Sequence, residues 1–457
     1  MRYFMEPEST AIIGISRRSG PGSYNLMENM LRYGYQGRIF PINPKADEIL
    51  GVKAYANIRG VGRKIDLAII SLPRELVVKS VQECAEAGVK AVIVVSQGFA
   101  DADIRGKILQ HELAAIAKEN GLRILGPNTL GVVNNFNNFT TSFMPLTREK
   151  SPVGLICQSG VFFVGTAVFT GQIGKGIDIG NACDIGFYEA LKYLGDDPDI
   201  KVIAIHMEGL EHARPFLSLA RPIVREKPVV VFKTGQSEAG AKAAASHSGA
   251  MAGHYQIYRA ALKQAGLLFL DEDAQMGDAV RTLLRQPSIK GNRIAVVSVT
   301  GAGGIMATDA LERYGLELAS LSEKTINALA DLSPGWMPLG NPLDIWPAVM
   351  KHGLSDVYTA ILREVLADNN VDGALCISIA PKLPDFDFLD VSEALNKIMD
   401  KKIEKPVVAW LYGPNVKEIS EKFDKGNRIT VYETIEKAAW SLGLLRERQQ
   451  FLEKEKA

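Results

Sequence analysis

Two polar side chains in this chain are of the types that carry out group transfer. His247 lies in the run AAASHSGAMAG, where small neighbours leave its imidazole open to a reactant. An unprotonated imidazole nitrogen is a competent nucleophile near neutral pH. Glu208 follows the apolar run KVIAIHM, and the C-terminal edge of a parallel strand is where ligands and catalytic groups gather. Glu208 could bind the second imidazole nitrogen of His247, and it is equally compatible with a surface loop acid.

The other five histidines have less favourable surroundings. They lie in an amphipathic helix, at a strand end or among polar residues, at positions His111, His206, His212, His254 and His352. None belongs to an HxxxH or HExxH pattern, so we predict no metal site on this chain. His247 is therefore the predicted nucleophile.

A glycine-containing turn near the N-terminus could approach a phosphate group. Gly14–Gly22 (GISRRSGPG) follows the first predicted strand and precedes a helix, whose N-terminus favours anions, although a turn that binds nothing fits as well. A dinucleotide site of the nicotinamide type needs an acid after the second strand, where Asn43–Lys45 (NPK) stands instead. Lys45, with Arg17 and Arg18, favours a ligand that carries additional phosphate.

A second turn could bind phosphate further along the chain. Gln158–Gly160 (QSG) lies between a short strand and an apolar helix, so Ser159 and the following amides could bind phosphate. The alternative is a simple helix N-cap. Gly171–Gly176 (GQIGKG) does not have the order GxxxxGK[ST], so it is not a P-loop.

The elements that position these residues follow from hydrophobic periodicity. Short β-branched runs alternate with amphipathic stretches, which predicts α/β architecture with parallel sheets and right-handed crossovers. The predicted strands of the first third are Thr10–Ile15, Arg38–Ile42, Ile65–Ser71, Ala91–Val95 and Arg123–Leu125. Those of the second are Gly154–Cys157, Gly176–Ile179, Val202–His206, Val229–Phe232 and Leu267–Leu270. Those of the third are Ile294–Val299, Glu317–Leu318, Gly373–Ile379, Val407–Leu411 and Ile429–Val431.

These three sets predict three domains, at 1–128, 129–287 and 288–457. The first is Rossmann-like. The Asn- and Thr-rich segment Asn134–Thr141 is predicted to be a loop between the first two domains, and 286–292 a second linker. Residues 446–457 are predicted to form a charged helical tail.

Composition excludes several classes of protein. The 457 residues include 52 basic and 52 acidic ones, and this balance argues against a general nucleic-acid binder. The 4 cysteines are scattered without a CxxC pair, which predicts neither a disulfide framework nor zinc and fits a reducing compartment. No signal peptide and no run of apolar residues long enough for a membrane span is present. We therefore expect a soluble, cytoplasmic protein.

Taken together, the motifs resemble the α subunit of ADP-forming acyl-CoA synthetases, the acetyl-CoA synthetase (ADP-forming) group of the succinyl-CoA synthetase superfamily. GISRRSG and INPKADEILG resemble its CoA-binding domain, and GPNTLGVVN resembles its GPN-C-x-G motif, with Thr129 in place of cysteine. GLICQSGVF and DIGNACD resemble its phosphate-binding segments, ASHSGAMAG its phosphohistidine motif and MEG its orienting glutamate. TGAGG and NPLDI resemble the additional C-terminal ligase-like domain of this group.

The resemblance implies a fold, a reaction and a partner. The fold is a Rossmann-like CoA-binding domain followed by two flavodoxin-like, ligase-CoA-type parallel-sheet domains. Acyl-CoA, ADP and phosphate are converted reversibly to carboxylate, ATP and CoA, through acyl phosphate and a phosphohistidine. ADP or ATP and Mg²⁺ are expected on an ATP-grasp β subunit, in an α2β2 heterotetramer.

The resemblance also implies roles for individual residues. His247 would be phosphorylated and Glu208 would orient it. The residues expected to bind CoA are Gly14, Ser16, Arg17, Arg18, Asn43, Pro44, Lys45, Ser71, Pro73, Ser96, Gly98 and Asn128. Those expected to bind phosphate are Gln158, Ser159, Gly160, Gly180, Asn181, Ser248 and Gly249.

Two other functions stay open at this point: an NAD(P)-dependent oxidoreductase and a non-catalytic CoA-binding regulatory protein. The missing acid after the second strand disfavours the first, and the presence of both His247 and Glu208 disfavours the second. The carboxylic acid itself is not predicted. Phe139, Phe143 and Met144 are equally compatible with an acyl site and with the core.

Overall fold

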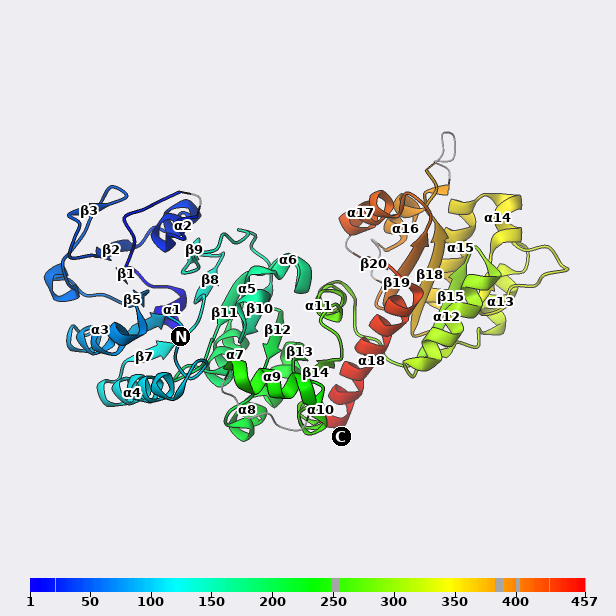
Figure 1. The fold of residues 1–457 in the computed structure, drawn as a ribbon. Coiled ribbons are helices and arrows are strands. Elements are labelled where there is room, and N and C mark those ends of the chain that lie inside the picture. The colour runs from blue at the N-terminus through cyan, green and yellow to red at the C-terminus, as the bar shows by residue number, and fades with distance from the viewer. Residues whose placement is uncertain (21, 249–254, 383–388, 400–402, 427, 457) are drawn as a thin grey trace. The chain divides into compact units, whose positions relative to one another are not determined.

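The computed structural model describes residues 1–20, 22–248, 255–382, 389–399, 403–426 and 428–456, and side chains throughout these ranges except at 245–248. The chain divides into two compact units, Met1–Val280 and Arg281–Ala457 (Figure 1). Among the described residues, no helix is long and apolar enough to cross a membrane.

The first sheet of unit 1 has five parallel strands in the order β2-β1-β5-β6-β7. They are β1 (Ser9–Ile13), β2 (Arg38–Ile42), β5 (Leu67–Ile70), β6 (Ala91–Val94) and β7 (Arg123–Leu125). Helix α1 (Arg2–Met5) precedes β1, and the connections contain α2 (Leu26–Tyr33), the hairpin β3 (Glu48–Ile49) and β4 (Val52–Lys53), the 3₁₀ helix η1 (Ile58–Val61), α3 (Arg74–Glu86) and α4 (Ile104–Asn120). Val81 of α3 and Leu113 of α4 share one core with Ile70 and Val92 of the sheet. The strands are continuous apolar runs because helices cover the sheet.

The second sheet of unit 1 has seven strands in the order β14-β13-β12-β10-β11-β8-β9. They are β8 (Val132–Asn134), β9 (Phe139–Thr140), β10 (Val153–Cys157), β11 (Lys175–Asp178), β12 (Val202–Met207), β13 (Val229–Lys233) and β14 (Leu268–Leu270). Its helices are α5 (Gly160–Val164), α6 (Thr166–Phe169), α7 (Phe187–Asp196), α8 (Ala213–Glu226), α9 (Glu238–Ser248), α10 (Tyr255–Gln264) and α11 (Gln275–Arg285), and α11 contains the boundary to unit 2. Strands β10 to β14 pair in parallel, as predicted.

The prediction of a loop over Asn134–Thr141 is wrong in part, because 135–138 form a turn but Asn134, Phe139 and Thr140 lie in strands. Part of this segment forms β8 and β9, an antiparallel hairpin that extends the second sheet beyond β11. Two of its four asparagines are buried structural donors: Asn134 Nδ2 donates to the Met5 carbonyl at 3.1 Å and Asn135 Nδ2 to the Ile173 carbonyl at 2.7 Å. An Asn-rich composition indicates a loop only where the amides face water, and here they satisfy buried backbone groups.

Unit 2 is built on a third sheet with the order β16-β15-β18-β19-β20, and β17 also pairs with β15. Its strands are β15 (Arg293–Ser298), β16 (Glu317–Leu318), β17 (Leu343–Asp344), β18 (Gly373–Ile379), β19 (Val407–Tyr412) and β20 (Ile429–Tyr432). Its helices are α12 (Gly301–Arg313), α13 (Glu323–Leu329), α14 (Trp346–His352), α15 (Leu354–Ala367), α16 (Ser392–Met399), α17 (Val416–Gly426) and α18 (Ile435–Lys456). The predicted tail is the end of α18, which begins earlier than expected.

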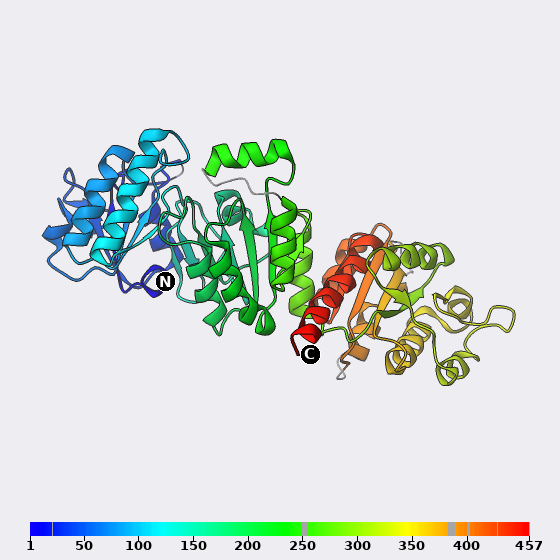
Figure 2. The same cartoon turned by 90° about the horizontal axis from the view of Figure 1, so that it is seen from below.

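The strands of unit 2 bury both of their faces. Along β15, Ile294 and Val296 belong to one core cluster, whereas Ala295 and Val297 belong to another. This alternation follows from the two-residue period of a strand, and helices on both sides of the sheet supply the two cores. Figure 2 shows the helices of each unit around its sheets. The predicted α/β class with parallel sheets is confirmed, and the three domain boundaries stay a prediction.

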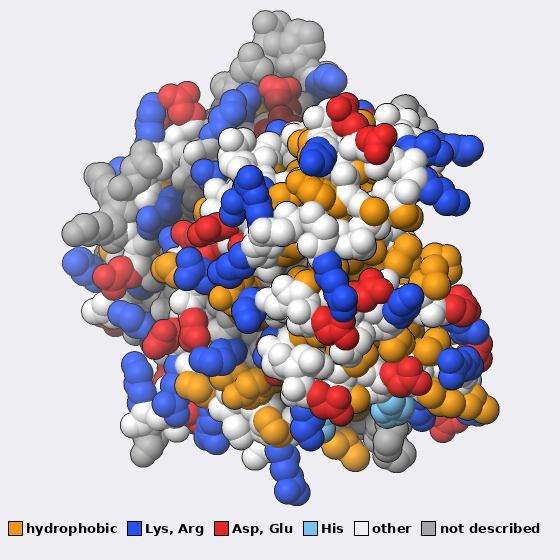
Figure 3. Space-filling model, turned by 90° about the vertical axis from the view of Figure 1, so that its left-hand side faces the viewer, with side chains coloured by type: hydrophobic (Ala, Val, Ile, Leu, Met, Phe, Trp, Pro, Cys, Tyr) orange, Lys and Arg blue, Asp and Glu red, His pale blue; other side chains and the backbone are white. Residues whose placement is uncertain are grey.

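Side chains of both charges occur across the face of the molecule shown in Figure 3. Lys and Arg side chains are interspersed there with Asp and Glu side chains. A phosphate backbone is bound by a surface with an excess of positive charge. Acidic side chains interrupt the basic ones across this face, so the side chains drawn in colour form no uniformly basic surface.

Candidate active site

A cavity of about 330 Å³ lies in unit 1, where loops of its two sheets meet. Residues after β6 and β7 of the first sheet line it together with the turn after β10 and the end of β11. The lining residues are Val95, Gln97, Asp101, Asn128, Thr129, Leu130, Phe143, Gln158, Ser159, Gly160 and Asp178. The cavity therefore lies at the C-terminal edge of parallel strands, where ligands bind in such sheets.

The loop after β7 and the turn after β11 are in backbone contact. The Asn181 N–H donates to the Pro127 carbonyl at 2.9 Å. A Cβ at Gly180 would lie 2.5 Å from the Asn128 carbonyl oxygen, and Gly180 has φ +53°, so no other residue fits this turn without strain. This contact joins the segments that sequence reasoning assigned separately to CoA and to phosphate.

Asp178, which was not among the predicted site residues, lies in the cavity wall. Its carboxylate is hydrogen-bonded both to the loop after β7 and to the turn after β11. It is 2% exposed, and its carboxylate accepts the Leu130 N–H at 2.7 Å and the Gly180 N–H at 3.3 Å. Burial raises the pKa of Asp178 to about 6, against the lowering effect of these hydrogen bonds. The sequence shows that an acidic residue ends the strand KGID, but it does not show that this residue is buried.

The Gln158–Gly160 turn is hydrogen-bonded to the loop that carries Glu208. Gln158 Oε1 accepts the Glu208 N–H at 2.7 Å and the Gly209 N–H at 3.0 Å. Backbone N–H groups can only donate, so Gln158 presents its oxygen to this loop and its NH₂ group is directed elsewhere. Ser159 is the N-cap of α5 but makes no capping hydrogen bond through its side chain, which argues against the simple N-cap interpretation.

Two further residues hold the Glu208 loop from the opposite side. Lys233, 2% exposed at the end of β13, donates from Nζ to the Glu208 carbonyl at 3.0 Å and to the Thr234 carbonyl at 2.9 Å. Its ammonium lies 4.8 Å from the centre of the Tyr258 ring, and Tyr258 Oη accepts the Leu210 N–H at 3.3 Å. Burial lowers the pKa of Lys233, while the nearby Glu208 charge opposes that effect. The backbone of Glu208 and of the two residues after it is thus held by side chains from β13, α10 and the Gln158–Gly160 turn.

His206, in β12 two residues before Glu208, is a buried structural residue. Its ring stacks on Phe162 of α5, with centroids 3.8 Å apart and planes 11° apart. Burial, assisted by the Lys233 charge, lowers the pKa of His206 to about 3, so the ring is neutral. The stack packs α5 against β12, next to the Glu208 loop.

The residues expected to bind CoA gather at the C-terminal edge of the first sheet. Gly14, with φ +86°, would place a Cβ 2.3 Å from the Ser71 carbonyl, so this turn needs glycine. The Asn43 side chain braces the first loop, donating from Nδ2 to the Ile15 carbonyl at 3.0 Å and accepting the Lys45 N–H at 2.8 Å. At the position where a dinucleotide site of the nicotinamide type has an acidic residue, Asn43 therefore stabilises the loop.

The basic residues of this edge face solvent. Ser16, Arg17, Arg18, Pro44 and Lys45 are exposed, and Arg17 Nη1 donates to the Lys45 carbonyl at 3.3 Å. Ser96 Oγ donates to the Leu72 carbonyl at 2.6 Å, which ties the loop after β6 to the one containing Ser71 and Pro73. The Gly98 carbonyl accepts from Arg74 Nη1 at 2.8 Å. The loops after β1, β2, β5 and β6 thus form one edge with cationic side chains free to meet an anion.

Comparisons with known proteins identify the family. Residues 8–135 match the model of the CoA binding domain, and residues 150–283 match that of the succinyl-CoA ligase like flavodoxin domain. The α subunit of the ADP-forming acetate–CoA ligase II of Pyrococcus furiosus is 34% identical over 442 residues, which are 96% of this chain and 95% of that subunit. The chain belongs to this family of ADP-forming acetate–CoA ligase α subunits.

Two further similarities agree with this assignment. The ADP-forming acetate–CoA ligase II of Archaeoglobus fulgidus is 35% identical over 421 residues, 90% of this chain, and the matched region spans 61% of that longer protein. A solved structure of the dinucleotide-forming acetyl-coenzyme A synthetase 1 of Ca. Korarchaeum cryptofilum, in complex with phosphate and ADP, is 30% identical with a TM-score of 0.88 and covers 100% of this chain and 98% of that one. The predicted family is confirmed, and neither alternative function is favoured.

The predicted phosphohistidine of this ligase α subunit lies near the edge of what the structure describes. His247 and Ser248 form the last turn of α9, their side chains are not among those described, and Gly249 lies outside the described residues. Asn181 Nδ2 donates to Asp101 Oδ1 at 2.6 Å and to Gln110 Oε1 at 3.1 Å, and its Oδ1 accepts from Asn128 Nδ2 at 3.5 Å, so its side chain links the loop after β6, α4 and the loop after β7. The roles of all predicted site residues in the ligase stay predictions.

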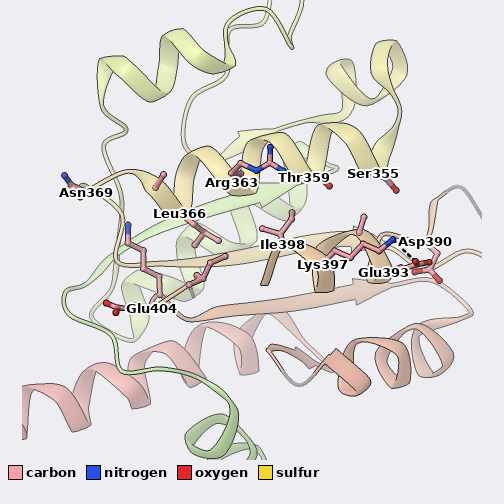
Figure 4. Close-up of a pocket in the computed structure, with 14 residues that line it drawn as sticks. Ser355, Thr359, Arg363, Leu366, Asn369, Asp390, Glu393, Lys397, Ile398 and Glu404 are labelled. Carbon is pink, nitrogen blue, oxygen red and sulfur yellow. Dashed lines mark ion pairs between the residues drawn. The ribbon is translucent and has the colours of Figure 1, made fainter. Parts of the chain in front are cut away.

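The α subunit has a second, larger cavity in unit 2, of about 900 Å³ (Figure 4). Helices α15 and α16 line it with residues such as Arg363, Lys397 and Glu393. The Lys397–Glu393 ion pair, at 2.8 Å, is largely exposed. Exposed pairs of this kind are solvated and weak, so this cavity lacks the buried polar groups that distinguish the one in unit 1.

Proposed function

We propose that this chain is the α subunit of an acid–thiol ligase that converts acyl-CoA, ADP and phosphate reversibly to carboxylate, ATP and CoA. The observation that carries the proposal is the single cavity lined by both the Asn128 loop and the Gln158 turn, with the Glu208 loop bonded to that turn. CoA and phosphate sites that share one cavity allow a thioester carbon and a phosphate oxygen to meet.

Three steps account for the reaction. A phosphate oxygen attacks the thioester carbonyl carbon, and the C–S bond breaks as CoA leaves with its electron pair. A ring nitrogen of His247 then attacks the phosphorus of the acyl phosphate, and the P–O bond to the acyl group breaks to release the carboxylate. An oxygen of ADP finally attacks that phosphorus, and the N–P bond breaks to regenerate His247.

The residues of the site would divide the work as follows. Gln158 would donate from its NH₂ group to a phosphate oxygen while its own oxygen holds the Glu208 loop. Ser159 and the amides of the turn would bind the remaining oxygens. Glu208 would accept the N–H of the imidazole, which leaves the other ring nitrogen free to attack. Lys45, Arg17 and the loops of the first sheet would bind the CoA phosphates.

We also propose a β subunit that holds the nucleotide, in an α2β2 assembly. The name of the Pyrococcus furiosus relative as a subunit alpha supports a partner chain. An ATP-grasp domain on that partner would bind ADP or ATP, together with Mg²⁺, which neutralises phosphate charge during transfer. We propose the domain limits 1–128, 129–287 and 288–457 for this chain, and a location in the reducing cytoplasm.

Radiolabelled phosphate tests the proposal directly. The complex of this chain with its β subunit is incubated with γ-labelled ATP and Mg²⁺, and the label on this chain should be acid-labile and base-stable. His247→Ala should abolish the label, and His111→Ala, which changes an exposed histidine of α4, should retain it. A label that persists on this chain in His247→Ala would overturn the phosphohistidine assignment.

A further inference from the structure

The cavity of unit 1 must also hold the acyl group, provided that the proposed function holds. It is lined by residues 128–130 on the CoA side and by the Gln158–Gly160 turn on the phosphate side. The thioester carbon must lie between these two segments for a phosphate oxygen to attack it. The acyl chain attached to that carbon therefore begins in this cavity, beside the side chains that form its wall.

The structure distinguishes Phe143 from the two other residues that the sequence suggested for an acyl site. Phe143 is half-buried and lines the cavity. Phe139 is buried in β9, where its ring packs against that of Tyr35. Met144 is not among the described residues that line the cavity. Phe143 is therefore the candidate that can reach an acyl chain.

Phe143 belongs to a small apolar part of the cavity wall. Among the described lining residues, Val95 and Leu130 supply the other apolar side chains. A Cβ on Gly160 would lie 2.9 Å from Leu130 Cδ1, so Leu130 packs against the backbone of the Gln158–Gly160 turn. An apolar chain that leaves the thioester carbon is removed from water most favourably against these side chains. Phe143 has the largest of the three.

The ring of Tyr24 supports that of Phe143. The two rings meet edge to face, with centroids 5.9 Å apart and planes 89° apart, a geometry that aromatic pairs favour. Tyr24 is not among the described residues that line the cavity, so it supports the wall without forming it. The position of the Phe143 ring therefore depends on a residue of the loop after β1.

Tyr24 adopts an unfavourable conformation for this contact. Its φ is +50°, which a bulky side chain disfavours, and it is 67% exposed. The backbone on both sides of the ring pair is braced, because Asn25 Nδ2 donates to the Arg18 carbonyl at 2.9 Å and Asn29 Nδ2 to the Ser142 carbonyl at 3.1 Å. A strained, exposed aromatic residue between two braced segments indicates a role beyond packing.

We propose that Phe143 contacts the acyl chain and limits its length, and that Tyr24 is a positioning residue that holds the Phe143 ring. The ring occupies volume that a longer aliphatic chain would need, and the cavity of about 330 Å³ must also hold phosphate and the thioester. In a hydrophobic pocket, one methylene more or less changes kcat/KM by about 10–200-fold. The side chain at position 143 thus sets the range of straight-chain carboxylic acids that this site accepts.

A series of acids tests the role of Phe143. The complex with the β subunit is assayed for acyl-CoA formation with acetate, butyrate and hexanoate. Phe143→Ala should raise the ratio of kcat/KM for hexanoate to that for acetate by about tenfold or more. Phe143→Leu, a smaller change if the alanine variant does not fold, should raise the ratio by about threefold. An unaltered or lower ratio in the variant that folds would overturn the proposal. Tyr188→Ala, a change of an exposed tyrosine in α7, is the control and should leave the ratio unaltered.

Two variants of Tyr24 separate positioning from a general structural role. Tyr24→Ala should raise the same ratio by about threefold, because the Phe143 ring loses its support. Tyr24→Phe keeps the ring edge and should restore the wild-type ratio. An equal loss of kcat/KM for all three acids in Tyr24→Ala, with the ratio unaltered, would contradict the positioning role.

This inference and the proposed function fail in different ways. If His247 is labelled from ATP but the ratio does not respond to Phe143, or none of these acids is activated, only the acyl wall is wrong. If His247 takes no label and none of the acids is activated, the proposed function itself fails.

Discussion

Two buried aspartates, Asp178 in unit 1 and Asp372 in unit 2, have opposite electrostatic surroundings. Asp372 is 8% exposed, and Arg293 donates to it from Nε at 2.9 Å and from Nη2 at 3.0 Å. Burial alone would raise the pKa of Asp372, but these bonds outweigh it and the pKa is lowered. Asp178 accepts two backbone N–H groups and, at 3.9 Å, the Cys157 thiol, with no charged donor among the bonds described, and burial raises its pKa.

The difference separates a structural carboxylate from a candidate functional one. Asp372 is fully compensated by an arginine, as expected of an acid that stabilises a fold. Burial disfavours the ionised form of Asp178, which lies beside a cavity, and groups with pKa values perturbed in this way cluster at functional sites. The same contrast extends to Lys233, whose ammonium is buried with two carbonyl acceptors beside Glu208.

The largest effect we expect is from Glu208→Gln. The amide keeps the size of the carboxylate but lacks its charge, so it cannot stabilise the imidazole as positive charge develops. Phosphorylation of His247 should slow by on the order of 10²-fold or more, measured by rapid quench with labelled ATP. CoA affinity should change little. Glu211→Gln, an exposed acid three residues away, serves as the control. A wild-type rate in Glu208→Gln would make Glu208 an ordinary loop acid.

Lys233→Met should slow phosphorylation by about tenfold, because it removes the donor that holds the Glu208 carbonyl. If Lys233 acts through Glu208, adding Lys233→Met to Glu208→Gln should cost little more, and the double-mutant cycle measures this. Lys192→Met, an exposed lysine of α7, is the control. Fully additive losses would assign Lys233 a general structural role, as would an equal loss in CoA binding.

Tyr258→Phe, which removes only the hydroxyl that accepts from Leu210, should have a smaller effect in the same direction.

Lys45→Ala probes the first sheet of unit 1, away from both aspartates. A cationic contact to a CoA phosphate is worth about 1–3 kcal/mol, so CoA affinity should fall by about tenfold. The KM for phosphate should stay the same, because phosphate binds at the Gln158 turn. Calorimetric titration with CoA measures the loss, with the exposed Lys118→Ala of α4 as the control. A parallel loss for phosphate would indicate that the two sites are not separate.

The smallest effects concern stability and pH, and they test the two aspartates directly. The pKa of folded Asp178 lies above its ordinary value, so the folded state takes up a proton as pH falls from 6 towards about 4 and its ionisation penalty disappears. The pKa of folded Asp372 lies below its ordinary value, so its contribution is present at neutral pH and is lost only below about pH 4. The two residues therefore change stability in opposite directions and in different ranges.

Thermal unfolding at constant ionic strength separates these contributions. Asp178→Asn should remove the part of the wild-type pH dependence between pH 4 and 6. Asp372→Asn should lower stability by about 1–2 kcal/mol at pH 7 and by less at pH 3.5. Identical pH profiles for wild type and Asp178→Asn would contradict the environment described for Asp178.

Hydrophobic patterning was sufficient to predict the sheets. Runs such as KVIAIHM and RIAVVS are continuous and apolar because their strands are covered on both faces, and this pattern can be recognised without knowing which elements cover them. Composition misled where buried contacts decide the local structure. Asn134 was predicted to lie in a loop but lies in β8, and the amides of Asn134 and Asn135 are buried donors to Met5 and Ile173.

The amino-acid sequence by itself determined the family, the α/β class and the candidate nucleophile, because these depend on residue types, short spacings and periodicity. Only the tertiary structure decided that Asp178 accepts from Leu130, that Gln158 bonds to Glu208, and that Lys233 and Tyr258 hold the same loop. These partners lie 25 to 50 residues apart along the chain, and no local pattern encodes such contacts. They arise because parallel strands bring their C-terminal ends to one edge, where burial then sets the charge state of each side chain.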